Sequence, residues 1–336
     1  MKKLVSLAMA AAMTLSLAAA PAFAAEEDYG EYNWTLAMTV SETTTNYKMV
    51  EYFANLVNEK SNGSITIDLY PGGQLANTTE QDEAVVAGSI DMVTGMTADL
   101  TDFVKEMALF DMPNVFDSID HMRNFLEGDY AKTQINEYCE ASGIHMIAFS
   151  DAGFRQLTTN VETKTVEDLK NQKIRVMTNK YHIAYWNEVA NAVPMQFNEL
   201  FMGLQQGTVD GQENPYMNIV GNNLQEVQKY VVETNHVGHI IVFFMNNDLY
   251  QSLPDNTKAL IDECAAEAAE FAKGVANESI ELDKQTVVDA GCEIVTFSDE
   301  DLATLREKAQ VVYDMVREDL GDDTVQQFMD AIDAAR

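Results

Sequence analysis

Alternation of strand-like and helix-like segments dominates this 336-residue sequence. Runs of apolar and β-branched residues include WTLAMTV at 34–40 and SITIDLY at 64–70, and between them lies NYKMVEYFANLVNEKS at 46–61, whose apolar residues have helical spacing. Such alternation is typical of parallel sheets covered by helices. The sequence therefore predicts an α/β fold.

A second series of units follows the strand-like IHMIAFS at 144–150. It comprises the strand-like KIRVM at 173–177, the helix-like KYHIAYWNEVANA at 180–192 and the strand-like VDGQENP at 209–215. A chain of 336 residues exceeds the size at which one core usually stops growing, so we expect two lobes. We assign residues 31–151 and 240–280 to the first lobe, and residues 152–239 and 281–336 to the second.

The connection between the lobes is predicted to be short and extended. The sequence contains no Pro- or Ser-rich linker, so we expect a hinge of crossing strands near residues 150–153 and 232–242. A stretch rich in Ala, Glu and Lys from about 256 to 290 predicts one long helix that runs along both lobes.

The first residues have the pattern of a secretory signal. Met-Lys-Lys precedes a small and apolar run over 4–20, and Ala22-Phe23-Ala24 is a small-x-small cleavage site. We expect a signal peptide over residues 1–24, cleaved near Ala24. No later apolar run reaches the length of a membrane-spanning helix, so we expect a soluble protein outside the cytoplasm.

The formal net charge of -33 restricts the partners of the chain. It excludes nucleic acid and anionic membrane surfaces as partners, and it favours a monomer. Cys264 and Cys292 would lie on the order of 40 Å apart along the predicted long helix. Because a disulfide needs Cα atoms within about 7 Å, we expect these two and Cys139 to be free, buried thiols.

No nucleotide-binding glycine motif, zinc-protease motif or nucleophile elbow is found, so no catalytic residue, cofactor or metal is assigned. His236 and His239 are flanked by β-branched residues. A strand would direct their side chains to opposite faces, so we expect structural, hydrogen-bonded histidines. A secreted lyase or hydrolase of acidic substrates remains an alternative and would need a catalytic base in a cleft.

Two of the six arginines occur beside strand-forming residues. In QKIRVM, Ile174 and Val176 share one face of a strand and Arg175 lies on the other, near the strand end where open α/β sheets bind ligands. Arg155 follows Gly153 in the predicted crossing segment. The two guanidiniums could converge on one cleft and hold a carboxylate through paired hydrogen bonds, or they could pair with some of the 54 acidic residues.

Two further residues are candidates for the same cleft. Phe197 directly precedes a predicted helix, where its ring could stack on a ligand or pack as a hydrophobic staple. Asn214 ends a predicted strand before Pro215 and offers both a donor and an acceptor. The loop SETTTN at 41–46 is predicted to cap a helix, and it could also line the cleft.

Four segments, in this order, carry a resemblance to a known family. They are SNGSITIDLYPGGQL, GFRQLTTN with VEDLKNQKIRV behind it, MQFNELFMGLQQGTVDGQENP, and TNHVGHIIVFFMNNDLYQSLP. The chain resembles the substrate-binding subunit of tripartite ATP-independent periplasmic (TRAP) transporters, of the C4-dicarboxylate and organic-acid type. The resemblance implies a two-lobed periplasmic-binding-protein-like fold, an organic-acid ligand in the cleft, a periplasmic location and a membrane permease as partner.

The resemblance also implies roles for individual residues. Arg175 matches the principal carboxylate clamp and Arg155 a second contact, while Phe197 and Asn214 match residues that line the cleft. The loops around Glu42 and Thr97 correspond to contacts that vary with the ligand. We expect a sugar acid or a dicarboxylate, and a sensor-associated binding protein of the same fold is an alternative function.

Overall fold

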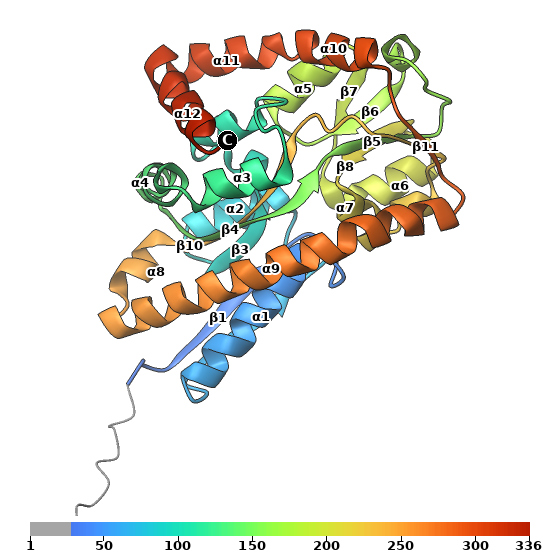
Figure 1. Ribbon diagram of the computed structural model, residues 1–336. Coiled ribbons are helices and arrows are strands. Elements are labelled where there is room, and N and C mark those ends of the chain that lie inside the picture. The colour runs from blue at the N-terminus through green and yellow to red at the C-terminus, as the bar shows by residue number, and fades with distance from the viewer. Residues whose placement is uncertain (1–27) are drawn as a thin grey trace, which may run out of the picture.

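The computed structural model describes residues 28–336, so the predicted signal peptide over 1–24 lies outside the described residues. Figure 1 shows two groups of strands, with the long helix α9 (Asp255–Asp289) running along both. Three C-terminal helices lie on the opposite side of the molecule: α10 (Asp299–Lys308), α11 (Gln310–Leu320) and α12 (Asp322–Ala334). This arrangement is the α/β, two-lobed fold that the sequence predicts.

The first sheet has five strands in the order β2-β1-β3-β10-β4. Strand β1 is parallel to β2 and β3, whereas β10 is antiparallel to both of its neighbours. The strands are β1 (Tyr32–Ala37), β2 (Ile65–Tyr70), β3 (Met92–Met96), β4 (Ile144–Phe154) and β10 (Gly238–Asn246). The helices of this part are α1 (Thr45–Lys60), α2 (Thr78–Val86), α3 (Ile119–Glu127), α4 (Asn136–Ala141) and α8 (Asn247–Ser252), with the 3₁₀ segments η1 (Thr97–Leu100) and η2 (Lys105–Asp111).

The second sheet has six strands in the order β11-β9-β5-β8-β6-β7. Strand β6 is parallel to β7 and β8, and β5 is antiparallel to β8 and β9. The strands are β5 (Gln156–Thr159), β6 (Lys173–Val176), β7 (Asn191–Pro194), β8 (Gly211–Asn214), β9 (Tyr230–Val232) and β11 (Glu293–Val295). The helices of this part are α5 (Lys180–Asn187), α6 (Leu200–Gln205) and α7 (Tyr216–Gly221), with the 3₁₀ segment η5 (Phe197–Glu199) before α6.

The chain crosses between the sheets twice through extended segments. Strand β4 of the first sheet ends one residue before β5 of the second, and Arg155 occupies the junction. The return crossing runs from β9 to β10. The return crossing falls within the hinge predicted at 232–242, and the junction of the first crossing lies two residues beyond the hinge predicted at 150–153. Gly153 lies in the first crossing with a φ of +73°, a conformation that glycine adopts without strain.

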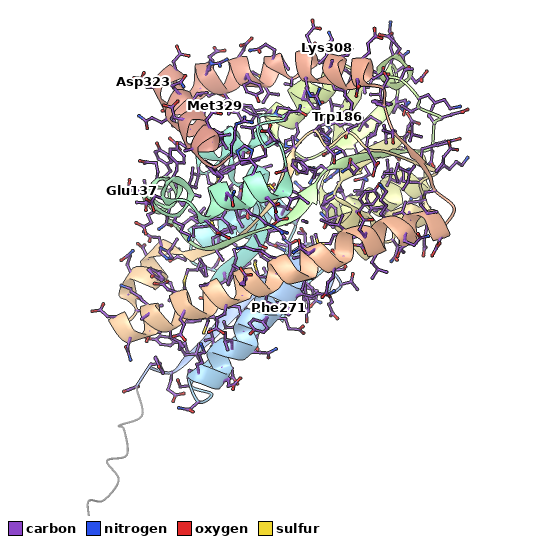
Figure 2. The ribbon with its side chains drawn as sticks, viewed as in Figure 1. Glu137, Trp186, Phe271, Lys308, Asp323 and Met329 are labelled. Atoms are coloured by element: carbon purple, nitrogen blue, oxygen red, sulfur yellow. The ribbon has the colours of Figure 1, made fainter. Side chains whose placement is uncertain are left out.

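Helix α9 joins the two parts of the fold and confirms the predicted long helix. It packs against α1 and β4 of the first sheet and against α7 of the second. Phe271, labelled in Figure 2, lies on the exposed side of α9 and stacks on Tyr52 of α1 with ring centroids 4.5 Å apart. The three cysteines are buried and free.

The C-terminal helices pack on both parts of the fold. Phe328 of α12 contacts Phe110 and Phe125 of the first part at ring-centroid distances of 5.5 and 5.2 Å. Helix α11 packs against both η2 and α5. Because these helices contact both parts, their contacts do not assign them to one lobe. The assignment of residues 281–336 to the second lobe stays a prediction.

In residues 28–336, no helix is long and apolar enough to cross a membrane.

Candidate ligand-binding site

A cavity of about 50 Å³ lies between the two sheets, at the ends of strands from both. Arg155, Arg175, Phe197 and Asn214 all line it, so the structure brings four of the six predicted site residues together. The other lining residues come from both parts of the chain: Thr39, Val40, Asn46, Thr78, Thr94, Gly95, Met96, Asp99, Met177, Thr178, Met195, Gln196, Asn218 and His239.

Arg175 projects from β6 into the cavity, as the alternation along this strand predicts. Ile174 and Val176 point the other way and are fully buried in the core. The Nε and Nη2 atoms of Arg175 donate hydrogen bonds to the main-chain oxygen of Met195 at 2.9 and 2.6 Å. Its Nη1 has no partner among the described residues, although the side chain is buried.

Phe197 lies beside this guanidinium. The Arg175 Cζ atom is 5.7 Å from the centroid of the Phe197 ring, within the range of a cation–π contact. The ring also packs against two apolar clusters, so it serves the staple role as well. Burial lowers the pKa of Arg175 to about 10, which leaves the side chain charged at neutral pH. An unpaired buried charge that faces a cavity is costly unless a ligand compensates it.

Arg155, in contrast, is paired with an acid of the protein itself. Its Nε donates to Glu213 Oε2 at 2.5 Å, and its Nη2 donates to Glu213 Oε1 at 2.9 Å and to the Glu213 main-chain oxygen at 2.5 Å. The Nη1 atom donates to His239 Nδ1 at 2.8 Å and contacts Met96 Sδ at 3.4 Å. All five N–H groups of this guanidinium therefore have a protein partner.

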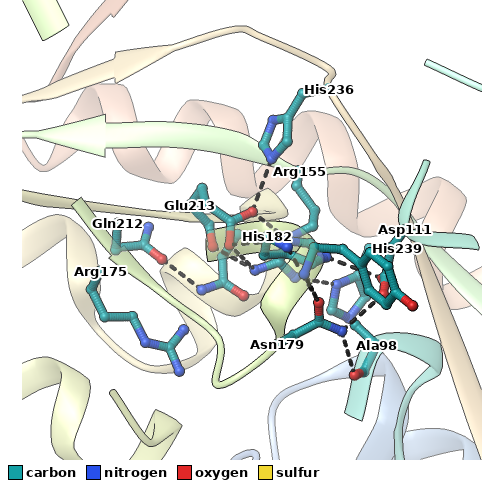
Figure 3. A network of polar contacts seen from close by, with 12 residues as sticks. Ala98, Asp111, Arg155, Arg175, Asn179, His182, Gln212, Glu213, His236 and His239 are labelled. Atoms are coloured by element: carbon teal, nitrogen blue, oxygen red, sulfur yellow. Dashed lines mark hydrogen bonds and ion pairs between the residues drawn. The ribbon is translucent and has the colours of Figure 1, made fainter. Parts of the chain in front are cut away.

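Glu213 is fully buried and lies at the centre of this network (Figure 3). Burial alone would raise the pKa of its carboxyl group, but the charge of Arg155 and the hydrogen bonds from His236 and Arg155 outweigh burial and lower the pKa. Glu213 is therefore ionised and balances the charge of Arg155.

The structure corrects the expected placement of the two histidines. His236 precedes β10 instead of lying within a strand, and its imidazole approaches the same acid–arginine pair as that of His239 (Figure 3). His236 Nε2 donates to Glu213 Oε2 at 2.9 Å, and its Nδ1 accepts from Thr234 at 2.8 Å. Burial lowers the pKa of both imidazoles, so both are neutral and structural.

A second polar cluster joins the two parts of the fold outside the cavity lining. Asn179, which caps α5, donates to the main-chain oxygen of Ala98 at 2.9 Å and to Asp111 Oδ2 at 2.8 Å (Figure 3). His182 contacts the other oxygen of Asp111 at 3.1 Å. These bonds fix the start of α5 against η1 and η2.

The remaining two predicted site residues lie apart from the cavity wall in the described chain. Glu42 is exposed on the loop between β1 and α1, and Thr97 is buried in η1. The first turn of α1 and the segment η1 nevertheless contribute Asn46 and Asp99 to the lining. Sequence reasoning included Asn46 only as part of the loop 41–46 that could also line the cleft, and it missed Asp99, because one aspartate among 54 acidic residues carries no distinguishing pattern.

A larger cavity of about 690 Å³ lies between β4, α3 and α9. Its two best-buried cations are paired with acids of the same lining: Arg123 donates to both oxygens of Asp151 at 2.6 and 3.2 Å, and Lys273 pairs with Glu127 and Glu270. We assign the ligand site to the smaller cavity because a guanidinium that is both buried and incompletely hydrogen-bonded, that of Arg175, lies there. Among residues 28–336, no group of three or more His, Cys, Asp or Glu side chains could hold a metal ion.

Two α/β lobes linked by crossing strands, with a charged cavity between their sheets, define a two-lobed binding protein. The sequence matches the bacterial extracellular solute-binding protein family 7 over residues 36–319, and the chain belongs to this family. The predicted resemblance to TRAP solute-binding subunits is thereby confirmed.

Named relatives support this assignment. The C4-dicarboxylate-binding periplasmic protein DctP of Rhodobacter capsulatus is 30% identical over 292 residues, which cover 85% of this chain and 86% of that protein. The sugar acid binding protein DctPAm of Advenella mimigardefordensis, solved in complex with galactonate, has a TM-score of 0.88 at 26% identity and covers 92% of this chain and 100% of its own. A TRAP periplasmic solute binding protein of Sulfurospirillum deleyianum, solved with succinate, has a TM-score of 0.84 at 26% identity and covers 91% of this chain and 100% of its own.

Proposed function

We propose that this chain binds a small organic acid in the cavity between its sheets and delivers it to a TRAP membrane permease. The observation that carries the proposal is the Arg175 guanidinium, which is buried and charged and whose Nη1 has no partner among residues 28–336. A ligand carboxylate would complete its hydrogen bonds, and charge-assisted bonds of this kind are the strong ones.

The setting of this function is also part of the proposal. A signal peptide over residues 1–24 would direct the chain out of the cytoplasm. The mature protein would then act in the periplasm as a soluble monomer. The named relatives bind C4-dicarboxylates or were solved with galactonate or succinate, and all of these ligands carry a carboxylate. In this proposal the chain catalyses no chemical reaction, since a solute-binding protein captures its ligand and releases it unchanged.

Calorimetry of the Arg175→Ala variant tests the role of the cavity. A panel of organic acids is first screened on the wild-type protein by thermal shift, because a ligand raises the unfolding midpoint by mass action. For each acid that binds, we expect Arg175→Ala to weaken binding by about 2–5 kcal/mol, as for truncation of one partner of a buried charged pair. The exposed Arg306→Ala variant is the matched control and should bind like the wild type. Unchanged affinity in Arg175→Ala contradicts the proposal.

Uptake measurements test delivery. Cells that express the permease should accumulate a labelled acid only when this chain is present with an intact Arg175. A chain that binds the acid but leaves uptake unchanged would instead support a sensor-associated role.

A further inference from the structure

The cavity beside Arg175 is also lined by residues with hydrogen-bond acceptor atoms that have no donor among the described residues. Asp99 of η1 lines the cavity, and its Oδ2 accepts a hydrogen bond from the main-chain N–H of Met96 at 3.0 Å. No donor in the described residues reaches its other oxygen, Oδ1. One oxygen of the carboxylate therefore accepts a hydrogen bond from the protein, and the other can accept one from a ligand.

Asn46 provides a second acceptor. Its Nδ2 donates to the main-chain oxygen of Gly95 at 3.2 Å. A main-chain oxygen can only accept, so the amide orientation is fixed and Oδ1 is directed elsewhere. This Oδ1 is buried and has no partner among the described residues.

Asn218 provides a third acceptor, and its orientation is set by a relay of hydrogen bonds. Gln228 Nε2 donates to main-chain oxygens, so Gln228 Oε1 accepts from the Thr158 hydroxyl at 2.7 Å. Thr158 accepts from Gln212 Nε2 at 2.9 Å, and Gln212 Oε1 accepts from Asn214 Nδ2 at 2.5 Å. Asn214 Oδ1 then accepts from Asn218 Nδ2 at 3.0 Å. The relay runs in one direction and leaves Asn218 Oδ1 as a buried acceptor without a partner.

The charges of the lining point to the same kind of ligand. Glu213 compensates Arg155, so Arg175 is the unpaired cation of the lining and Asp99 is its unpaired anion. Burial raises the pKa of Asp99 to about 6, which still leaves it ionised at neutral pH. One ligand carboxylate fits Arg175, but a second one near Asp99 would be repelled by a like charge in a poorly solvated cavity.

We infer that the cavity selects a short monocarboxylate that carries several hydroxyl groups over an unsubstituted dicarboxylate, with Asp99, Asn46 and Asn218 accepting hydrogen bonds from the hydroxyls. This inference rests on the proposed function, because it assumes that a carboxylate occupies Arg175. The cavity volume of about 50 Å³ corresponds to roughly four water molecules, which favours a short ligand.

Three four-carbon acids isolate the effect of the second functional group. L-threonate has one carboxylate and three hydroxyls, butanoate has the carboxylate alone, and succinate has two carboxylates. Calorimetry on the full mature chain at pH 7.5 should show threonate binding at least about tenfold more tightly than either of the others, since a hydrogen bond to a charged group is worth roughly a factor of ten or more.

The Asp99→Asn variant tests the selecting residue. It keeps the size and one acceptor of the side chain but removes the charge. We expect its preference for threonate over succinate to fall at least about tenfold, with threonate binding weaker and succinate binding tighter. Asp102→Asn removes an exposed carboxylate three residues away and is the matched control, with an unchanged preference. Thermal melts of both variants confirm that each is folded.

The outcomes separate this inference from the proposed function. If succinate binds more tightly than threonate, or if Asp99→Asn leaves the preference unchanged, the inference is wrong while carboxylate binding stands. If none of these acids and none of a wider panel binds with an affinity that depends on Arg175, the proposed function itself fails.

Discussion

Arg155 and Arg175 show that a residue's neighbours decide its role in the cavity. Arg155 directs every N–H group of its guanidinium to Glu213, His239 or Met96. A ligand carboxylate at Arg155 would have to compete with contacts that are already made. Among the described residues, Arg175 has one hydrogen-bond partner, the main-chain oxygen of Met195, and its Nη1 donors remain available to a ligand. Of the two interpretations open from the sequence, an internal ion pair describes Arg155, and the ligand clamp is the proposal for Arg175.

Asp82 of α2 gives a pH-dependent prediction at the same scale. Its side chain is buried, its Oδ2 has no partner in the described chain, and it faces Asp99. Burial, followed by the negative charge of Asp99, raises the pKa of Asp82 well above 3.8. A raised carboxyl pKa means that the folded state holds the proton more tightly than the unfolded state. The stability cost of ionisation is therefore absent below about pH 4 and grows as pH rises through the folded-state pKa.

The variant Asp82→Asn cannot ionise. We expect its thermal midpoint to exceed that of the wild type by at least about 2 °C at pH 8, and the difference should vanish towards pH 4. Melting curves without ligand at pH 4, 6 and 8 measure this. Asp68→Asn removes an exposed carboxylate of β2 and should give no such trend. A gain that is equal at pH 4 and pH 8 would point to packing as the cause, because charge could not produce it.

At the scale of elements, the periodic signals of the sequence predicted most of what the structure contains. The alternating residues of β6 place Arg175 correctly, because a strand allows only two directions. The helical stretch after residue 256 predicted α9, because Ala, Glu and Lys favour long helices. The packing of α12 on α3 could not be predicted, since an amphipathic pattern shows that a helix has an apolar face but not which partner covers it.

The site was predictable to a smaller extent for the same reason. Asn214 could be proposed because it ends a strand, where ligands bind in α/β folds. Asp99 enters the cavity from the short 3₁₀ segment η1, where no periodic pattern of the sequence fixes the direction of a side chain, and Asn46 enters it from the first turn of α1. The pairing of Arg155 with Glu213 joins residues 58 positions apart and depends on the register of β5 against β8.

Helix α9 itself allows a prediction about stability. Gly274 lies in its middle, and a Cβ atom there would meet nothing within 4 Å. We expect Gly274→Ala to raise the free energy of unfolding by about 0.5–1 kcal/mol, because alanine loses less backbone entropy in a helix. Urea unfolding measures this. The same substitution at Gly291, where φ is +94°, should destabilise the protein instead. A loss of stability in Gly274→Ala would show that α9 needs a flexible point there.

At the scale of the whole molecule, direct contacts across the cavity hold the two parts together. Ser41 and Thr43, in the loop before α1, donate to the main-chain oxygen of Gly221 at the end of α7, at 2.6 and 3.3 Å. Gln196 of the second part donates to Thr79 of α2 at 3.2 Å. We expect a ligand that touches both parts to add to these contacts and to shift the population towards the closed form.

Gly221→Val should therefore weaken binding without touching the cavity. A Cβ atom at Gly221 would lie 3.0 Å from Thr44 Cγ2 and 3.1 Å from Thr43 Oγ1, so a bulky side chain wedges the two parts open. We expect at least about tenfold weaker binding of L-threonate, since a closed state that is destabilised by about 1.4 kcal/mol reduces the apparent affinity tenfold. Small-angle X-ray scattering should show that threonate reduces the radius of gyration of the wild type more than that of the variant. Gly274→Val adds the same side chain in open space and should close and bind normally, so a similar loss in both variants would assign the effect to general destabilisation and not to the interface.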